Sequence, residues 1–129
     1  DNWLRLPRAL GDRADLIIFR VPIDRLASER LAASAARVIE PPTVADLVAA
    51  MSLLDVVVSA DSAPVHLAAG LNLQAVAFFE DRPEKFLRWY PLGIRHVLLR
   101  AGARVDAISA DAATEAVDRL LDEHILVPQ

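Results

Sequence analysis

The chain has 129 residues, the size of one domain, and 54% of them are hydrophobic, which excludes a disordered tail. Its formal net charge of -4 argues against a nucleic-acid-binding protein, because such proteins carry an excess of basic residues. Cysteine is absent, which excludes disulfides and cysteine nucleophiles, and no apolar run approaches the roughly 18 residues needed to cross a bilayer. The first residue is Asp, so we expect a processed product or a piece of a longer protein.

Apolar runs alternate with helical patterns in the first half of the chain. Residues 16–19 predict a short strand, residues 24–37 have apolar side chains at helical spacing, and residues 37–39 predict a second strand. Thr43 is a favourable N-cap for the next helix, with Asp46 three residues later. We expect that helix to bury one apolar face, formed by Val44, Leu47, Val48, Met51 and Leu54.

Residues 55–59 form the clearest predicted strand, because they are β-branched and apolar on both faces, as in a buried parallel strand. Pro64 suits the first turn of the helix that follows, at residues 65–71, because its missing N–H has no partner there in any case. Residues 74–79 predict another buried strand. The pattern of strand, helix and strand therefore continues through the middle of the chain.

The last third begins with a predicted polar and aromatic loop at residues 80–91 and a last strand at residues 95–99. Ser109 is expected to cap a final helix at residues 110–124. Alternating strands and helices are typical of an α/β fold, in which helices cover both faces of a parallel sheet. We therefore predict one Rossmann-like domain over residues 1–129.

The best candidate site is the segment 59–66, where a buried strand leads into the N-terminus of a helix. Ligands of open α/β sheets bind beyond the carboxyl ends of the strands, and the free amides of a first helical turn favour an anion such as phosphate. Two alternatives remain open, since Asp61 and Ser62 are also ordinary helix caps and His66 also suits a core histidine. The chain has no glycine-rich phosphate loop, no histidine pair with metal-ligand spacing and no nucleophile elbow.

Basic residues are concentrated between positions 82 and 104, where six of them lie. One interpretation is a set of solvated surface charges. The other is a rim that attracts an anionic substrate, formed by Arg82, Lys85 and Arg88, whose loop leaves a strand next to Ser62.

The run LDVVVSADSAPVHLAAGL at residues 54–71 resembles the signature of glycosyltransferase family 9, the ADP-heptose:lipopolysaccharide heptosyltransferases and their relatives. The usual form of that signature is S-N-D-[ST]-G-x-x-H-[LI]-A-A-A-L. Residues 74–79 match the strand that follows it, and WYPLG at residues 89–93 resembles the W-x-P-L-G found next. The resemblance extends from about Trp3 to Leu121.

This resemblance implies the carboxyl-terminal half of a two-domain GT-B glycosyltransferase, the half that binds the nucleotide diphosphate sugar. The implied reaction inverts the anomeric centre of the donor, with a nucleotide diphosphate as leaving group and ADP-heptose as the first guess for the donor. From the residues themselves we expect no metal and no cofactor. The other domain would bind a lipopolysaccharide-type acceptor and carry the catalytic base, so we assign no base here. The implied location is the cytoplasm, at most peripheral to the inner membrane.

Carried over onto this sequence, the family motif makes Asp61 the residue that holds sugar hydroxyls. The amides of Ser62 and Ala63 would face the diphosphate, and His66 would line the same pocket. A carboxylate after the first visible strand often meets the ribose in this fold, and Asp24 is the nearest candidate.

The chain departs from the family pattern at three positions, because Ala60, Ala63 and Glu80 stand where the family has Asn, Gly and Gly. The Glu80 carboxylate would either repel a diphosphate or bind a ribose. It favours an alternative function, a non-catalytic module that kept the fold. A further alternative is an interaction domain that uses Phe86, Trp89 and Tyr90, although these rings also suit a plain cover for the sheet edge.

Family topology also implies a strand ahead of Trp3 that lies between residues 16–21 and 55–59. Three outcomes are open: residues outside this chain supply that strand, the two edges pair with each other, or a partner chain lends a strand. We expect the first, because unmatched backbone groups on two buried edges are costly.

Overall fold

The computed structural model describes residues 2–20, 25–33 and 37–126. The helices are α1 (Asn2–Leu10), α2 (Arg25–Ala32), α3 (Val44–Met51), α4 (Ala63–Gly70), α5 (Pro83–Trp89) and α6 (Ala110–Leu126). The strands are β1 (Ile17–Phe19), β2 (Arg37–Ile39), β3 (Val56–Ala60), β4 (Gln74–Phe79) and β5 (His96–Arg100). No helix of the described residues is both long enough and apolar enough to cross a membrane.

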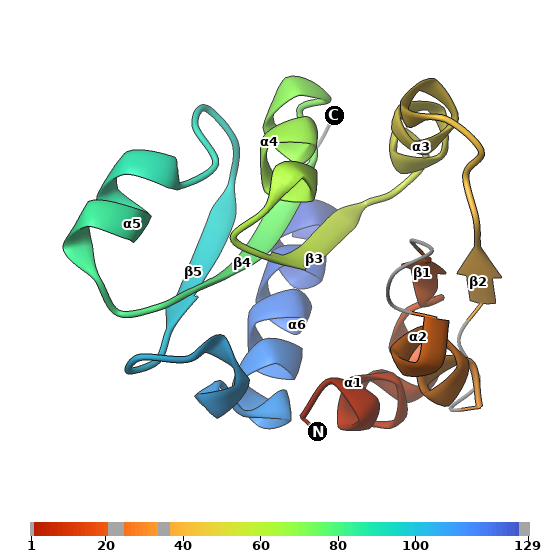
Figure 1. The fold of residues 1–129 in the computed structure, drawn as a ribbon, viewed down its shortest axis with the longest axis horizontal. Helices are drawn as coiled ribbons and strands as arrows, with labels where there is room; N and C mark the ends of the chain where they lie inside the picture. Colours follow the sequence, from red (N-terminus) through yellow and green to blue (C-terminus); the bar gives the residue numbers. More distant parts are fainter. Residues whose placement is uncertain (1, 21–24, 34–36, 127–129) are drawn as a thin grey trace.

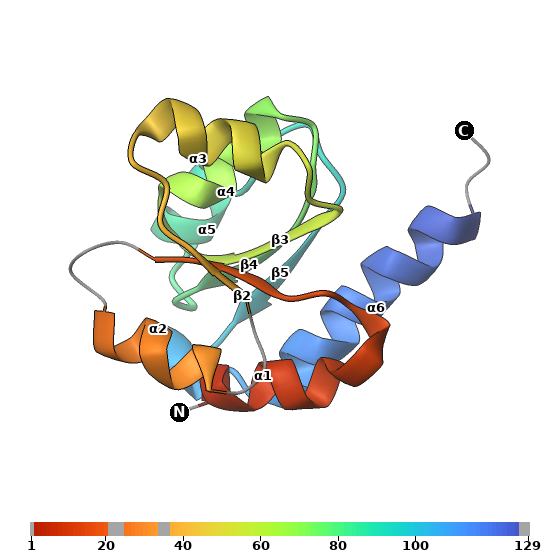
Figure 2. The same ribbon diagram turned by 90° about the vertical axis from the view of Figure 1, so that its right-hand side faces the viewer.

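The strands form two parallel sheets, one of β1 and β2 and one in the order β3-β4-β5 (Figure 1). Figure 2 shows the strands as a middle layer, with α3, α4 and α5 on one face and α1, α2 and α6 on the other. The predicted α/β class, with a parallel sheet covered on both faces, is therefore confirmed.

Each face of the larger sheet has its own apolar core. On one face, Val76 and Phe78 of β4 pack against α1 and α6. On the other face, Met51 of α3 and Ala68 of α4 pack against Val57 and Ala75. Alternate residues of β4 point to opposite faces, so all but the first residue of that strand is buried. This two-sided burial explains the continuous apolar run at residues 74–79.

The helix caps predicted from the sequence are present. The Thr43 side chain accepts a hydrogen bond from the Asp46 amide at 3.1 Å, and Ser109 Oγ accepts one from the Ala112 amide at 3.1 Å. Met51 is buried, as expected. Val44 is not, because it lies in the first turn of α3 and packs against neither core, so its predicted inward position is wrong.

Helix α5 lies where the sequence predicts a loop, and that prediction is wrong. Pro83 takes the first helical position, where a missing N–H costs no hydrogen bond. Phe86 then packs against Val65 and Phe79, which fixes α5 beside α4 on the same face of the sheet. This long-range contact stabilises a helix of only seven residues.

The two sheets share a core, although they do not join. Phe19 of β1 packs against the cluster that contains Met51 and Val57, and Leu16 packs against the cluster of β4 and α6. Among the described residues, no ladder pairs β1 with β3. Direct pairing of β1 with β3, one of the three outcomes left open by the sequence, is therefore not observed.

Candidate functional site

The turn between β3 and α4 lies at the carboxyl edge of the larger sheet. Ala60 is paired in register with Phe78, and the Asp61 amide donates to the Phe78 carbonyl at 3.0 Å. The turn therefore begins one residue after the ladder ends. Asp61 and Ser62 lie at the edge where ligands of parallel sheets bind.

The Ser62 hydroxyl does not cap α4, although Ser62 occupies the N-cap position with extended backbone angles (φ -162°, ψ 179°). Its Oγ instead donates to the Ala60 carbonyl at 3.2 Å and lies 3.2 Å from Ser59 Oγ. Ser59 Oγ donates to the same Ala60 carbonyl at 3.0 Å. The interpretation of Ser62 as a plain side-chain cap therefore does not hold.

Two amides at the start of α4, those of Ser62 and Ala63, have no acceptor among the described residues. Pro64 has no N–H, and the Val65 amide donates to the Ser62 carbonyl at 3.2 Å. In the part of the chain that the structure describes, no acceptor is within hydrogen-bond distance of the Ser62 and Ala63 amides. Together with the positive end of the helix dipole, these two donors favour an anion.

The Asp61 carboxylate is half-exposed beside these amides. Within the described ranges it makes no ion pair and no side-chain hydrogen bond. A buried pair with an arginine would have indicated a structural role for Asp61, and the described residues show none. The carboxylate is instead available to accept hydrogen bonds from hydroxyl groups of a ligand.

His66 is exposed on α4, so the interpretation of a core histidine is wrong. Its ring lies edge-on to the indole of Trp89, with centroids 6.0 Å apart and an interplanar angle of 71°. This contact joins the turn at β3 to the end of α5. It connects two segments that the sequence analysis treated as separate candidates.

Glu80 follows β4 at the same edge of the sheet and is half-buried. Arg82 lies close to two carboxylates, with Nη1 3.6 Å from Glu80 Oε2 and Nε 2.9 Å from Glu84 Oε1. A hydrogen bond from its own amide and the Arg82 guanidinium hold the pKa of the Glu84 carboxyl below its ordinary value of 4.5. Arg82 therefore offsets part of the negative charge next to Ser62.

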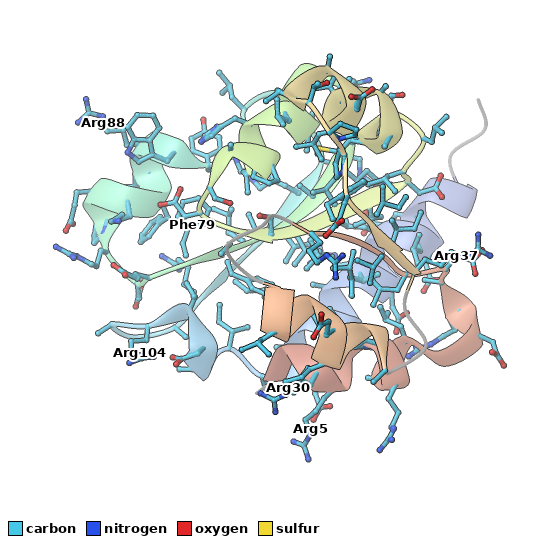
Figure 3. All side chains as sticks on the ribbon, turned by 45° about the vertical axis from the view of Figure 1, so that its right-hand side comes forward. Arg5, Arg30, Arg37, Phe79, Arg88 and Arg104 are labelled. Atoms are coloured by element: carbon cyan, nitrogen blue, oxygen red, sulfur yellow. The ribbon has the colours of Figure 1, made fainter. Side chains whose placement is uncertain are left out.

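The other two predicted rim residues lie further along α5. Lys85 is half-buried, and the Arg88 guanidinium lies 5.6 Å from the centre of the Trp89 ring. Figure 3 shows Arg88 at the outer end of α5, pointing away from the rest of the protein. A common rim with Ser62 stays a prediction, with Arg82 the member at the strand end. Asp24 lies outside the described residues.

A pocket of about 340 Å³ is lined by residues of β5 and α6. Helix α6 lies on the face of the sheet opposite α4 (Figure 2). The residues that line the pocket are Arg95, His96, Val97, Leu98, Arg119, Leu120 and Glu123. Two of these lining residues, Arg95 and Glu123, form an ion pair with each other. The pocket contains none of the predicted site residues. No three His, Asp or Glu side chains are placed to hold a metal within the described part of the chain.

Comparisons with known proteins decide the family. Residues 3–114 match the sequence model of glycosyltransferase family 9 (heptosyltransferase). The chain belongs to glycosyltransferase family 9. A search of curated proteins finds no match.

Two solved structures resemble the fold of this family 9 domain. One is the ADP-heptose lipopolysaccharide heptosyltransferase II of E. coli, with a TM-score of 0.78 and 24% identity, covering 95% of this chain and 41% of that one. The other is the family 9 glycosyltransferase of Veillonella parvula DSM 2008, with a TM-score of 0.75 and 17% identity, covering 94% and 42%. The chain therefore spans about two fifths of the length of each, and its fold is of the GT-B type found in these enzymes.

Within the family 9 domain, strand register explains which predicted residues come together. The pairing of β3 with β4 brings Asp61, Ser62 and Glu80 to one edge of the sheet. The contact between His66 and Trp89 was missed by the sequence analysis, because it depends on α5 lying beside α4. The signal available in the sequence was Phe86, whose burial holds α5 in that place.

Proposed function

We propose that this family 9 domain is the donor-binding half of an inverting glycosyltransferase. It binds a nucleotide diphosphate sugar at the turn between β3 and α4, with ADP-heptose the first donor to test. The observation that supports the proposal is that, within the described ranges, the amides of Ser62 and Ala63 have no acceptor and the adjacent Asp61 carboxylate forms no ion pair. Donors for an anion and an acceptor for hydroxyl groups are then adjacent, as a sugar diphosphate requires.

In this mechanism the protein stabilises the leaving group. The Ser62 and Ala63 amides donate to diphosphate oxygens, whose negative charge grows as the bond to the sugar breaks. Both amides are fixed by the turn and by α4, so they need no reorganisation during the reaction. Asp61 accepts hydrogen bonds from sugar hydroxyls and sets the position of the anomeric carbon.

The proposed enzyme contains a second domain, which binds a lipopolysaccharide-type acceptor and supplies the base that activates its hydroxyl. Support comes from the coverage, because the chain aligns with about two fifths of each related structure. We place the protein in the cytoplasm, peripheral to the inner membrane. Nothing in the proposed chemistry calls for a metal, because the two amides and α4 supply the positive field at the diphosphate.

Calorimetry with ADP-heptose and with ADP on the full-length protein tests this function. We expect Asp61→Ala to weaken ADP-heptose binding by about tenfold or more and to leave ADP binding unchanged, because Asp61 meets only the sugar. The matched control is Asp55→Ala, since Asp55 is an exposed carboxylate that precedes the other end of β3. No detectable binding of either ligand at millimolar concentration would instead support the alternative, a non-catalytic module.

That alternative is favoured by one specific observation, the half-buried carboxylate of Glu80 at the diphosphate edge. The same calorimetry on Glu80→Gly separates the two roles open to this residue. Tighter binding of ADP means that Glu80 repels the diphosphate, and weaker binding means that it holds the ribose. Arg82 pairs with Glu80, which reduces the repulsion and leaves room for the ribose role.

A further inference from the structure

Exposed apolar side chains are concentrated on one short stretch of the protein. Eight large apolar side chains are exposed among the described residues, and four of them fall within residues 87–92. They are Leu87, Trp89, Tyr90 and Leu92, which we call the 87–92 surface. Isolated exposed apolar residues are normal, but four within six consecutive residues make this stretch a candidate interaction site.

The 87–92 surface is held in a fixed position by ring contacts. Trp89 lies edge-on to His66, and Tyr90 lies against His96 with centroids 5.7 Å apart. His96 is itself fixed, since its Nδ1 lies 2.8 Å from the Ile94 carbonyl. Helix α5 packs on the sheet through Phe86, whose side chain contacts the cluster of Val65, Ala77 and Phe79. The exposed rings and leucines are therefore not what anchors α5, and they are presented at little cost in side-chain entropy.

The charges around this surface are net positive. From Lys85 to Arg104 the chain carries five basic residues and no acidic one, and the exposed carboxylate of α5 itself, Glu84, pairs with Arg82. Three of these five basic residues form ion pairs with acidic residues outside the stretch. The pairs are Arg95 with Glu123, Arg100 with Asp81 and Arg104 with Asp106. Lys85 and Arg88, on either side of Leu87, form no ion pair with another described residue.

A second group of acidic residues lies on the other face of the sheet. Helix α6 carries Asp111, Glu115, Asp118, Asp122 and Glu123, and it covers the face of the sheet opposite α5 (Figure 2). Figure 3 shows Arg88 projecting from the outer end of α5. An anionic surface would therefore meet the end of α5 without facing the acidic helix, although the net charge of the chain is -4.

We propose that the 87–92 surface docks the protein on an anionic lipid bilayer. Leu87 and Leu92 enter the boundary between headgroups and acyl chains, and the two aromatic rings lie at the headgroup level, where Trp and Tyr are enriched. Lys85 and Arg88 lie beside the lipid phosphates. This inference deepens the peripheral membrane association in the proposed function by naming its surface. Trp89 contacts His66 of the candidate site, but the readout here is binding to vesicles and not to ADP or ADP-heptose, so each proposal fails by its own experiment.

Sedimentation with lipid vesicles tests the apolar contact. We expect binding of the full-length protein to phosphatidylglycerol-containing vesicles and a loss of about a hundredfold in partitioning for the Leu87→Ser/Leu92→Ser variant, since each buried leucine contributes about tenfold. The matched control is Leu53→Ser, because Leu53 is 84% exposed in the turn before β3, against 67% for Leu87 and 72% for Leu92. Equal partitioning of both variants would overturn the proposal. Circular dichroism verifies that all three proteins are folded.

The charge contribution is tested with Arg88→Gln. We expect about fivefold weaker binding to phosphatidylglycerol vesicles at low salt and no change on phosphatidylcholine vesicles. Equal affinity of the unmodified protein for the two lipids would overturn the choice of an anionic bilayer.

A spectroscopic measurement places the surface at the membrane. The tryptophans of residues 1–129 are Trp3 and Trp89, so a full-length variant in which every tryptophan except Trp89 is replaced by phenylalanine has a single reporter. We expect its emission to shift to shorter wavelength on vesicle binding and to be quenched by brominated lipids. An unshifted spectrum with bound protein would show that another surface is used. A concentration-dependent dimer that the Leu87→Ser/Leu92→Ser variant abolishes, with no vesicle binding, would assign the surface to a second copy instead.

Discussion

At the residue scale, the candidate site depends on main-chain groups more than on side chains. The Ser62 hydroxyl donates to the Ala60 carbonyl, and among the described residues nothing accepts from the amides of Ser62 and Ala63. In the proposed site Ala63 would contribute only its amide, a group that Ala and Gly share. A side-chain deletion at this position would therefore not test the site.

The substitution Ala63→Pro removes the amide itself. Proline is compatible with the first helical position, and Ser62 before it already has the extended backbone that proline requires. We expect α4 to be retained and the affinity for ADP to fall about tenfold or more, because a hydrogen bond to a charged group is lost. Isothermal calorimetry measures this loss. Ala63→Ser keeps the amide and serves as the control, and equal affinity of the two variants would contradict the role of the Ala63 amide.

At the scale of elements, the sequence predicted most of the fold because local signals and tertiary packing agree. The run 74–79 reads as a buried strand and is one, and Thr43 and Ser109 cap the helices that follow them. The prediction failed where packing decides. Helix α5 begins at Pro83 and has seven residues, and a helix of that length would not be stable in isolation. It forms because the Phe86 side chain packs against Val65 and Phe79.

The candidate site was also predictable where local signals decide and not where packing between distant elements decides. The turn at 61–63 follows from the order of strand and helix, which a single sequence reveals. The neighbourhood of His66 did not follow, because Trp89 reaches it only through the placement of α5. Contacts between elements that are distant in sequence depend on packing that no local pattern encodes.

Phe86 should accordingly determine the stability of α5. Its ring packs into the cluster of Val65 and Phe79 and is covered by Arg100, whose guanidinium lies 4.3 Å from the ring centre. We expect Phe86→Ala to lower the free energy of unfolding by about 2 kcal/mol, less than for a fully buried phenylalanine because Phe86 is partly exposed. Urea denaturation measures the change. Leu87→Ala is the adjacent control, expected within about 0.5 kcal/mol of the unmodified protein, and a similar loss in both variants would contradict this account.

At the scale of the whole molecule, the two sheets have unpaired edges over a shared core. The hydrogen bond from the Asp61 amide to Phe78 fixes which residues of β3 face β4, since main-chain groups alternate along a strand. The main-chain N–H and C=O groups of Val56, Val58 and Ala60 therefore point away from β4, toward the unpaired edge of β3. In β1, the bonds between Leu16 and Arg37 and between Arg20 and Ile39 direct the main chain of Ile17 and Phe19 away from β2.

We expect one further parallel strand to lie between β1 and β3 in the folded full-length protein. Such a strand satisfies the main-chain groups of five residues, each of which costs about 1–3 kcal/mol if buried without a partner. It also places the chain that follows it beside the turn at Asp61, at the carboxyl edge. The proposed donor site would then gain a second wall of main-chain donors opposite Ser62 and Ala63.

Amide hydrogen exchange tests for this strand with an internal control. In the full-length protein we expect slow exchange at Val56, Val58 and Ala60, and at Val57 and Ser59, which face β4 in any case. In residues 1–129 alone, the first set should exchange faster by orders of magnitude, while Val57 and Ser59 stay comparatively protected. Protection of the first set that rises with the concentration of the isolated chain would mean that a second copy lends the strand. Equal exchange of both sets in both proteins would show that the edges are already satisfied, and the sheet would then be complete without another strand.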